Sequence, residues 1–111
     1  MNDCLFCKII AGEIPGNKVY EDDKVYAFRD INPQAPVHVL IVPKKHMDNV
    51  LACDDETAAA LANAIRVIAA QEGVSESGFR VISNCGHDGA QSVNHLHVHL
   101  LGGKPLTERM A

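Results

Sequence analysis

The stretch His95-Leu-His-Val-His-Leu-Leu101 places a histidine at every second position, with an aliphatic residue after each one. A β-strand sends alternate side chains to opposite faces, so this spacing predicts a strand with His95, His97 and His99 on one face. An α-helix would scatter the same three rings around its axis. We expect the aliphatic face to pack on a core and neighbouring imidazoles, about 7 Å apart, to reach one metal ion or one phosphate. The alternative is a surface strand whose histidines are there by chance.

Length and composition indicate one ordinary globular domain spanning residues 1–111, with 47% hydrophobic and 22% charged residues. The net charge of −4 argues against a dedicated nucleic-acid-binding protein, although one local pocket can still be positive. No basic segment followed by an apolar run stands at the amino terminus, and no apolar stretch is long enough to span a bilayer. We therefore expect a cytoplasmic protein with no membrane or nucleic-acid partner.

The rest of the chain predicts one main helix and several short strands. Residues 56–72 carry apolar groups at helical spacing, with Asp54 or Asp55 as the N-terminal cap and Gly73 as the stop. Short β-rich runs occupy 18–21, 24–29, 37–43 and 79–83, and a helical turn is expected within 4–14. One helix among about five strands joined by short connections indicates an antiparallel α+β domain.

Two of the four cysteines form the pair Cys4-Leu-Phe-Cys7. In a reducing compartment this spacing suggests metal ligation before it suggests a disulfide. His46 and His95 are the available partners, and a closed set of two cysteines and two histidines would hold a structural zinc ion. Two free structural thiols and a redox pair are the alternatives. Cys53 and Cys85 are expected to be structural thiols.

The loop from Asn84 to Asn94 leads directly into the histidine strand and is rich in groups that hold phosphate. Donors from Gln91 and Ser92 would keep a nucleotidyl group near an imidazole, which attacks phosphorus when its other nitrogen is held as N–H. Neighbouring histidines would stabilise charge on the phosphate oxygens, so no catalytic metal is expected. A zinc site made of three histidines is the competing interpretation. The loop alone is equally compatible with a plain surface connection.

Phe6, Phe28 and Ile31 are core residues by default, and lining a base-binding cleft is the alternative. Asp30 is able to accept hydrogen bonds from ribose hydroxyls, although a carboxylate in a loop is more often solvated or capping. His38 is the polar member of the otherwise apolar run 37–43 and needs a hydrogen-bond partner there.

These residues together resemble a known family. Residues 95–101 are similar to the histidine triad motif, His-φ-His-φ-His-φ-φ, of the HIT superfamily of nucleotide hydrolases and transferases. Further segments resemble its Hint branch, the histidine triad nucleotide-binding proteins, through nearly the whole chain. They are Phe6-Cys-Lys-Ile-Ile, Glu13-Ile-Pro, Tyr26 to His38, Val42-Pro-Lys-Lys-His46, Gly89-Ala-Gln-Ser-Val and Leu101-Gly-Gly103.

The resemblance implies a HIT-like fold: a five-stranded antiparallel sheet, one main helix and a short N-terminal helix. It also implies a homodimer whose two sheets join into one. The implied activity is hydrolysis of nucleoside 5′-phosphoramidates, such as adenosine 5′-phosphoramidate, through a covalent nucleotidyl-histidine intermediate with a bound purine nucleotide. A nucleotide-binding regulatory protein with incidental hydrolysis and a dinucleoside polyphosphate hydrolase are the alternatives.

Matching positions imply a role for each catalytic and binding residue. His97 is the expected nucleophile, His99 is expected to contact the phosphate, and His38 and His95 are expected to orient or support the ring. The remaining roles follow in the same way: Ser92 and Asn84 donate to the phosphate or leaving group with Gln91 nearby, Phe6, Phe28 and Ile31 hold the base, and Asp30 holds the ribose.

Two features depart from part of the family. Animal Hint proteins lack the cysteine pair, whereas Cys4 and Cys7 resemble bacterial members and the galactose-1-phosphate uridylyltransferases, in which two cysteines and two histidines bind structural zinc. By that comparison Cys4, Cys7, His46 and His95 form the zinc site. Ala90 stands where glycine is common, which restricts the backbone conformations of the loop.

Overall fold

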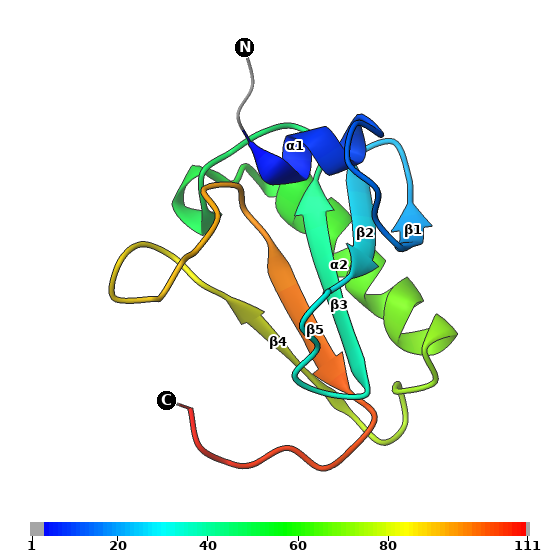
Figure 1. The fold of residues 1–111 in the computed structure, drawn as a ribbon. Coiled ribbons are helices and arrows are strands. Elements are labelled where there is room, and N and C mark those ends of the chain that lie inside the picture. The colour runs from blue at the N-terminus through cyan, green and yellow to red at the C-terminus, as the bar shows by residue number, and fades with distance from the viewer. Residues whose placement is uncertain (1–3, 111) are drawn as a thin grey trace.

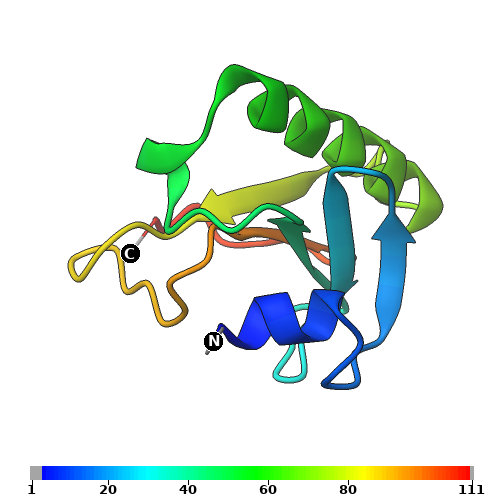
Figure 2. The ribbon, with the colours of Figure 1, turned by 90° about the horizontal axis from the view of Figure 1, so that it is seen from above.

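The computed structural model describes residues 4–110 as a five-stranded antiparallel sheet with a helix on each face (Figure 1). In spatial order the strands are β1 (Lys18–Glu21), β2 (Val25–Arg29), β3 (Val37–Pro43), β5 (Val98–Gly102) and β4 (Phe79–Ser83). The helices are α1 (Leu5–Ile10) and α2 (Asp55–Gln71), with the short 3-10 helix η1 (Val50–Ala52) before α2. Figure 2 shows α1 and α2 on opposite sides of the sheet. The predicted α+β class and its elements are confirmed.

Helix α2, Asp55–Gln71, begins and ends one residue before the predicted bounds of 56 and 72, with the predicted cap and stop. The Asp54 carboxylate accepts a hydrogen bond from the Thr57 amide at 2.7 Å and caps the first turn. Gly73, with φ of +73°, follows the C-cap residue Glu72 and ends the helix. The apolar stripe around Leu61 and Ile68 packs on the sheet and closes the larger of two cores. Neither helix within residues 4–110 is long and apolar enough to cross a membrane.

Strand β3 is buried on both faces because two separate cores use its alternate residues. Val39 and Ile41 belong to the core under α2, whereas Leu40 and Val42 pack with Phe6 and other residues of the smaller core under α1. This explains why the run 37–43 is almost wholly apolar, as the sequence predicts. It also leaves the histidine strand, β5, as the neighbour of β3 in the centre of the sheet.

The predicted bounds of the histidine strand are wrong at its start, because β5 begins at Val98 and not at His95. Two contacts replace the ladder before Val98: the His95 Nε2–H donates to the Pro43 carbonyl at 2.8 Å, and the Leu96 amide donates to the Met47 carbonyl at 2.7 Å. The chain nevertheless stays extended enough to keep the predicted alternation. Leu96, like Leu100 further on, lies in the core under α2.

Candidate active site and metal centre

A cleft of about 280 Å³ opens on the α1 side of the sheet. Helix α1 and β2 supply most of its apolar wall, and the histidine strand, the loop after β2 and the end of the 84–94 loop supply its polar groups. The lining residues include Leu5, Phe6, Ile9, Pro15, Gly16, Phe28 and Leu40 on the apolar side, and Asp30, Ser92, His97 and His99 among the polar ones. An apolar wall beside a few convergent polar groups is the usual form of a small-molecule site.

A larger hollow, of about 520 Å³, lies at another part of the surface, around Val74 and Lys104. No imidazole or thiol is among its lining residues. A further hollow, of about 490 Å³, includes Cys4 and His46, but the Nδ1 of His46 faces the Cys7 thiol and its Nε2 the Asp48 carboxylate. We therefore assign the chemistry to the cleft lined by His97, where a ring with an available nitrogen meets an apolar wall.

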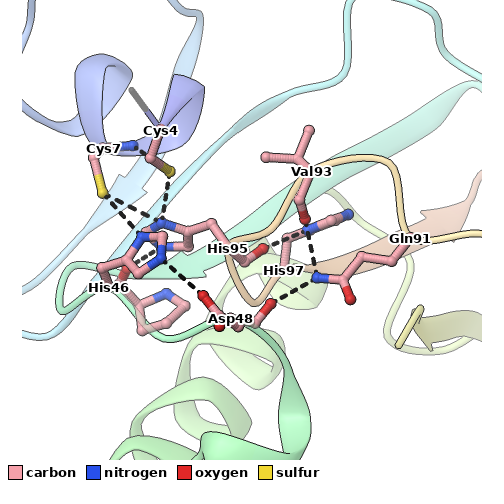
Figure 3. Close-up of polar contacts among 9 residues, drawn as sticks. Cys4, Cys7, His46, Asp48, Gln91, Val93, His95 and His97 are labelled. Atoms are coloured by element: carbon pink, nitrogen blue, oxygen red, sulfur yellow. Dashed lines mark hydrogen bonds and ion pairs between the residues drawn. The ribbon is translucent and has the colours of Figure 1, made fainter. Parts of the chain in front are cut away.

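The ring of His97 is held in one tautomer by its own strand. Its Nδ1 lies 2.7 Å from the His95 carbonyl oxygen, and because a carbonyl only accepts, Nδ1 carries the proton (Figure 3). In the neutral ring the lone pair then lies on Nε2. The ring is buried, lines the cleft and meets the edge of Phe6 with ring centroids 5.0 Å apart. His97 is thus an oriented imidazole with a free nitrogen, which is what nucleophilic attack on phosphorus requires.

His38 and His99 form a second pair whose tautomers follow from a backbone amide. The Gln34 amide donates to His38 Nδ1 at 3.0 Å, so the proton of neutral His38 lies on Nε2. That N–H faces His99 Nδ1 at 2.9 Å, which places the proton of His99 on its own Nε2. Because His99 lines the cleft, this N–H is available as a hydrogen-bond donor to a bound group.

Burial lowers the pKa of both His38 and His99 below their ordinary value of 6.5. The charge of Asp30, whose Oδ2 lies 3.4 Å from His38 Nε2, acts against this by raising the pKa of each ring. For His99 the neighbouring rings of His97 and His38 lower it further. Both rings are therefore neutral at pH 7, as the chain of hydrogen bonds requires.

Asp30, His38 and His99 bring three ligand atoms within 4.8 Å of one another, a spacing that suits a metal ion. Ligation through His38 Nε2 would move the proton of that ring to Nδ1, opposite the Gln34 amide, where two donors would face each other. One Asp30 oxygen also accepts from the Asn32 amide at 2.8 Å. The hydrogen bonds thus favour a proton chain here over metal ligation.

Cys4, Cys7, His46 and His95 form a separate cluster whose four ligand atoms lie within 4.8 Å of one another. Figure 3 shows both thiols pointing at the two imidazoles. The Cys4 Sγ lies 3.2 Å and the Cys7 Sγ 3.4 Å from His95 Nδ1, and Cys7 Sγ lies 3.4 Å from His46 Nδ1. This is the predicted Cys₂His₂ set, brought together from α1, the segment after β3 and the start of the histidine stretch.

Both histidines of this cluster present Nδ1 to the thiols, and an oxygen holds the opposite nitrogen. His95 Nε2–H donates to the Pro43 carbonyl and His46 Nε2–H to the Asp48 carboxylate at 3.2 Å. Such outer contacts are the ones that orient metal-ligating histidines. Two thiols and two oriented imidazoles fit zinc, which prefers a closed tetrahedral set of this composition in structural sites.

The 84–94 loop brings only one of its three expected donors to the cleft. Ser92 lines it, whereas the Gln91 amide donates both hydrogens to backbone carbonyls, to Asp48 at 2.6 Å and to Val93 at 3.0 Å. The Asn84 amide likewise donates to the Gly89 carbonyl at 2.6 Å. The structure therefore gives Gln91 and Asn84 a role in holding the loop.

Ala90 lies at the turn of this loop with φ of +59°, and within residues 4–110 it is the one non-glycine residue in the left-handed region. This is the position at which the family resemblance has glycine more commonly. An alanine pays a steric cost there that glycine does not. The loop nevertheless keeps its turn, since the Ala90 amide donates to the His87 carbonyl at 3.0 Å.

Replacing Gln91 with alanine is expected to lower kcat by about 10-fold, since the exposed Asp48 carbonyl and the half-buried Val93 carbonyl lose their donor and the loop that carries Ser92 loses this support. Steady-state kinetics on the purified variant would measure the loss. Gln91→Glu serves as the matched variant, because a carboxylate of the same shape cannot donate to either carbonyl and should be at least as damaging. Full activity in both variants would contradict the role given to Gln91.

Of the three predicted base-cleft residues, Phe6 and Phe28 are buried and also line the cleft, with ring centroids 5.5 Å apart. The default assignment of Ile31 to the core is wrong, because its side chain is 90% exposed at the cleft mouth. The Gln34 backbone amide and Gly16, where a Cβ would lie 3.1 Å from Ile9, were not predicted from the sequence. A backbone donor leaves no mark in a sequence, while Pro15-Gly16 carried only the signal of a turn.

Comparison with known proteins agrees with this geometry. The HIT domain family model matches residues 11–106. The chain is 48% identical to the purine nucleoside phosphoramidase of Escherichia coli K12, over 98% of this chain and 94% of that protein. It is 46% identical to a 14 kDa zinc-binding protein of Brassica juncea, over 94% of this chain and 96% of that protein. A solved histidine triad protein from Clostridium difficile superposes with a TM-score of 0.93 at 51% identity, covering 98% of this chain and 97% of that one. The chain belongs to the HIT domain family.

Proposed function

We propose that this chain is a purine nucleoside phosphoramidase, which hydrolyses the P–N bond of nucleoside 5′-phosphoramidates through a covalent intermediate on His97. The observation that carries the proposal is the 2.7 Å contact between His97 Nδ1 and the His95 carbonyl, which leaves Nε2 as the free nitrogen of a ring lining the cleft. The name of the Escherichia coli relative, at 48% identity, supports this substrate class.

The proposed nucleotide lies with its base against Phe6 and Phe28 and its ribose near Asp30. The apolar wall is built from Leu5, Phe6, Ile9 and Phe28, none of which has a side-chain hydrogen-bonding group. The base is therefore held by dispersion and aromatic contact, which accommodate either purine. One oxygen of the Asp30 carboxylate accepts a hydrogen bond from the Asn32 amide. The other oxygen lies near His38 and faces away from that hydrogen bond.

In the proposed reaction His97 Nε2 attacks phosphorus, the P–N bond breaks, and the amine leaves after taking a proton from solvent. His99 Nε2–H and Ser92 donate to the non-bridging oxygens, where negative charge grows in the transition state. Water then attacks phosphorus, the bond to His97 breaks, and the nucleoside monophosphate departs while one proton returns to solvent. Two displacements thus replace one difficult hydrolysis.

We further propose that Cys4, Cys7, His46 and His95 hold a structural zinc ion, a role that the zinc-binding relative supports. A closed four-ligand site binds the polypeptide together and has no position for substrate. Its cysteines must stay reduced to ligate, so we propose that the protein works in the cytoplasm, where thiols are kept reduced.

We propose a homodimer that forms through the open edge of β4. The other edge strand, β1, carries a bulge and exposed charged residues, both of which discourage edge pairing. Strand β4 instead exposes two large apolar side chains, Phe79 and Val81. Pairing of two β4 strands would join the sheets and cover these groups.

Val81→Lys is expected to convert this dimer into monomers, because the two new charges would face each other across the pairing axis. Sedimentation equilibrium measures the change in mass. Val50→Lys, which adds the same charge at an exposed residue of η1 and not of β4, is the control that should remain dimeric. A wild-type monomer, or a Val81→Lys dimer, would contradict the proposed interface.

The test of the proposed activity is steady-state hydrolysis of adenosine 5′-phosphoramidate, with a diadenosine polyphosphate assayed in parallel. We expect rapid release of AMP from the phosphoramidate and slower turnover of the polyphosphate. AMP binding with no turnover of either compound would overturn the proposal in favour of a regulatory nucleotide-binding protein. Faster turnover of the polyphosphate would instead identify a dinucleoside polyphosphate hydrolase.

A further inference from the structure

Helix α1 serves two sites at once. Cys4 and Cys7 extend from its start to the metal cluster (Figure 3). Leu5, Phe6 and Ile9 of the same helix line the cleft. Cys4 is the N-cap residue of this six-residue helix, and Cys7 lies inside it between the cleft residues Phe6 and Ile9. A shift of the cysteine side of this short helix would therefore also shift the side that lines the cleft.

The stability of α1 depends on these contacts rather than on its own hydrogen bonds. Isolated helices shorter than about 12 residues are marginal in water, because the first turn fixes several dihedral angles for one hydrogen bond. Its N-terminal cap is Cys4, whose sulfur accepts from the Cys7 amide at 3.4 Å, a long contact. What remains is the packing of Phe6 and Ile9 in the smaller core and the cysteine side of the helix.

Phe6 connects the metal cluster to the nucleophile directly. Its ring lies edge-on to His95, a member of the cluster, at 5.9 Å between centroids, and edge-on to His97 at 5.0 Å. His95 adds a second link, because its ring belongs to the cluster while its carbonyl fixes the tautomer of His97. One aromatic ring and one backbone oxygen thus join the metal site to the base wall and the reactive ring.

We propose that metal binding at the Cys₂His₂ cluster and nucleotide binding in the cleft are coupled through α1 and Phe6. Zinc raises the affinity of the cleft for nucleotide, and nucleotide raises the affinity of the cluster for zinc by the same factor, as linkage demands. The inference rests on the proposed nucleotide site. It makes Phe6 a positioning residue as well as part of the base wall.

The first test measures AMP affinity by calorimetry in zinc-loaded and zinc-depleted wild-type protein. We expect depletion to weaken AMP binding by about 10-fold or more, within the usual range of coupled sites. Competition with a chelator, with and without saturating AMP, should give the same factor for zinc. Equal AMP affinity in the two states would overturn the coupling alone, whereas a failure of zinc-loaded protein to bind AMP would refute the nucleotide site itself.

The double variant Cys4→Ser/Cys7→Ser should bind AMP as weakly as zinc-depleted wild-type protein does. Adding zinc should no longer change its AMP affinity. Cys53→Ser, at a cysteine that is not part of the cluster, is the matched control and should keep the full response. Thermal melting is recorded on each sample. Loss of a cooperative transition on depletion would also overturn the proposal, because the metal would then support the whole fold rather than α1.

Phe6→Leu separates transmission from metal binding. Leucine keeps an apolar side chain in the smaller core but removes the edge contacts with His95 and His97. We expect this variant to bind zinc with unchanged affinity in the absence of AMP, while the factor by which AMP raises that affinity falls toward one. An undiminished factor in Phe6→Leu would remove Phe6 from the proposal.

Discussion

Replacing His97 with alanine is expected to lower kcat for adenosine 5′-phosphoramidate by about 10⁴-fold or more, since removal of a covalent nucleophile costs up to about 10⁶ in kcat. The loss has one physical origin: no other imidazole lining the cleft has a free nitrogen, because His99 presents an N–H there. Binding of AMP should survive, since the apolar wall and Ser92 stay in place. Steady-state kinetics and calorimetry on the same preparation measure the two effects separately.

His87→Ala is the matched control for this variant. Its ring is fully exposed and contacts only the neighbouring Asp88 carboxylate among the hydrogen bonds of the described residues. It should keep wild-type kinetics. Rapid quenching of the wild-type reaction, followed by mass measurement of the intact protein, should in addition detect one nucleotidyl group per chain, and this adduct should be missing from His97→Ala. Turnover in His97→Ala within 10-fold of the wild type would rule out the covalent mechanism.

The orientation of the histidine stretch was predictable because alternation is a property of the extended chain itself. Leu96 and Leu100 point into the core as the pattern predicts, and His97 and His99 line the cleft. The start of β5 was not predictable, since it depends on which carbonyl the His95 ring reaches. That carbonyl belongs to Pro43, 52 positions earlier in the chain. A side chain that hydrogen-bonds to a strand carbonyl leaves no periodic pattern in the sequence.

The metal cluster was predictable in composition and the proton chain was not. A C-x-x-C pair and nearby histidines carry their chemistry in the sequence, and Cys4 and Cys7 do lie against His46 and His95. The tautomers of His38 and His99 instead follow from the Gln34 backbone amide, a group that every residue except proline possesses. The family resemblance indicated that these histidines have a role in catalysis. Which ring nitrogen carries each proton follows only from the hydrogen bonds of the folded chain.

Replacing His38 with alanine is expected to lower kcat about 100-fold, because the proton of His99 is then no longer fixed on Nε2. In the variant the proton of His99 can move to Nδ1, so that Nε2 presents a lone pair to the phosphate oxygens and repels them. KM should change less than kcat, since His38 does not line the cleft. Kinetics of His38→Ala beside His87→Ala measure the difference.

The same pair predicts how activity depends on pH. Both rings must be neutral for His38 Nε2–H to donate to the unprotonated Nδ1 of His99. Burial lowers the pKa of each ring below 6.5. The fraction of working enzyme is therefore high at and above pH 6.5 and falls only when the pH drops through the lowered pKa values. After subtraction of the uncatalysed rate, kcat/KM should be flat from pH 8 to 6.5 and decline below that range.

The Asp30→Asn variant tests whether protonation of His38 and His99 sets the pH dependence of kcat/KM. The Asp30 charge raises the pKa of both His38 and His99, so its removal lowers both values further. The acid limb of kcat/KM should then move to lower pH, even if loss of the carboxylate weakens ribose binding and reduces the plateau. A carboxylate that acted only on the ribose would change the height of the profile and leave its limb in place. A limb that stays fixed, or that moves to higher pH, would show that protonation of this histidine pair does not limit the reaction.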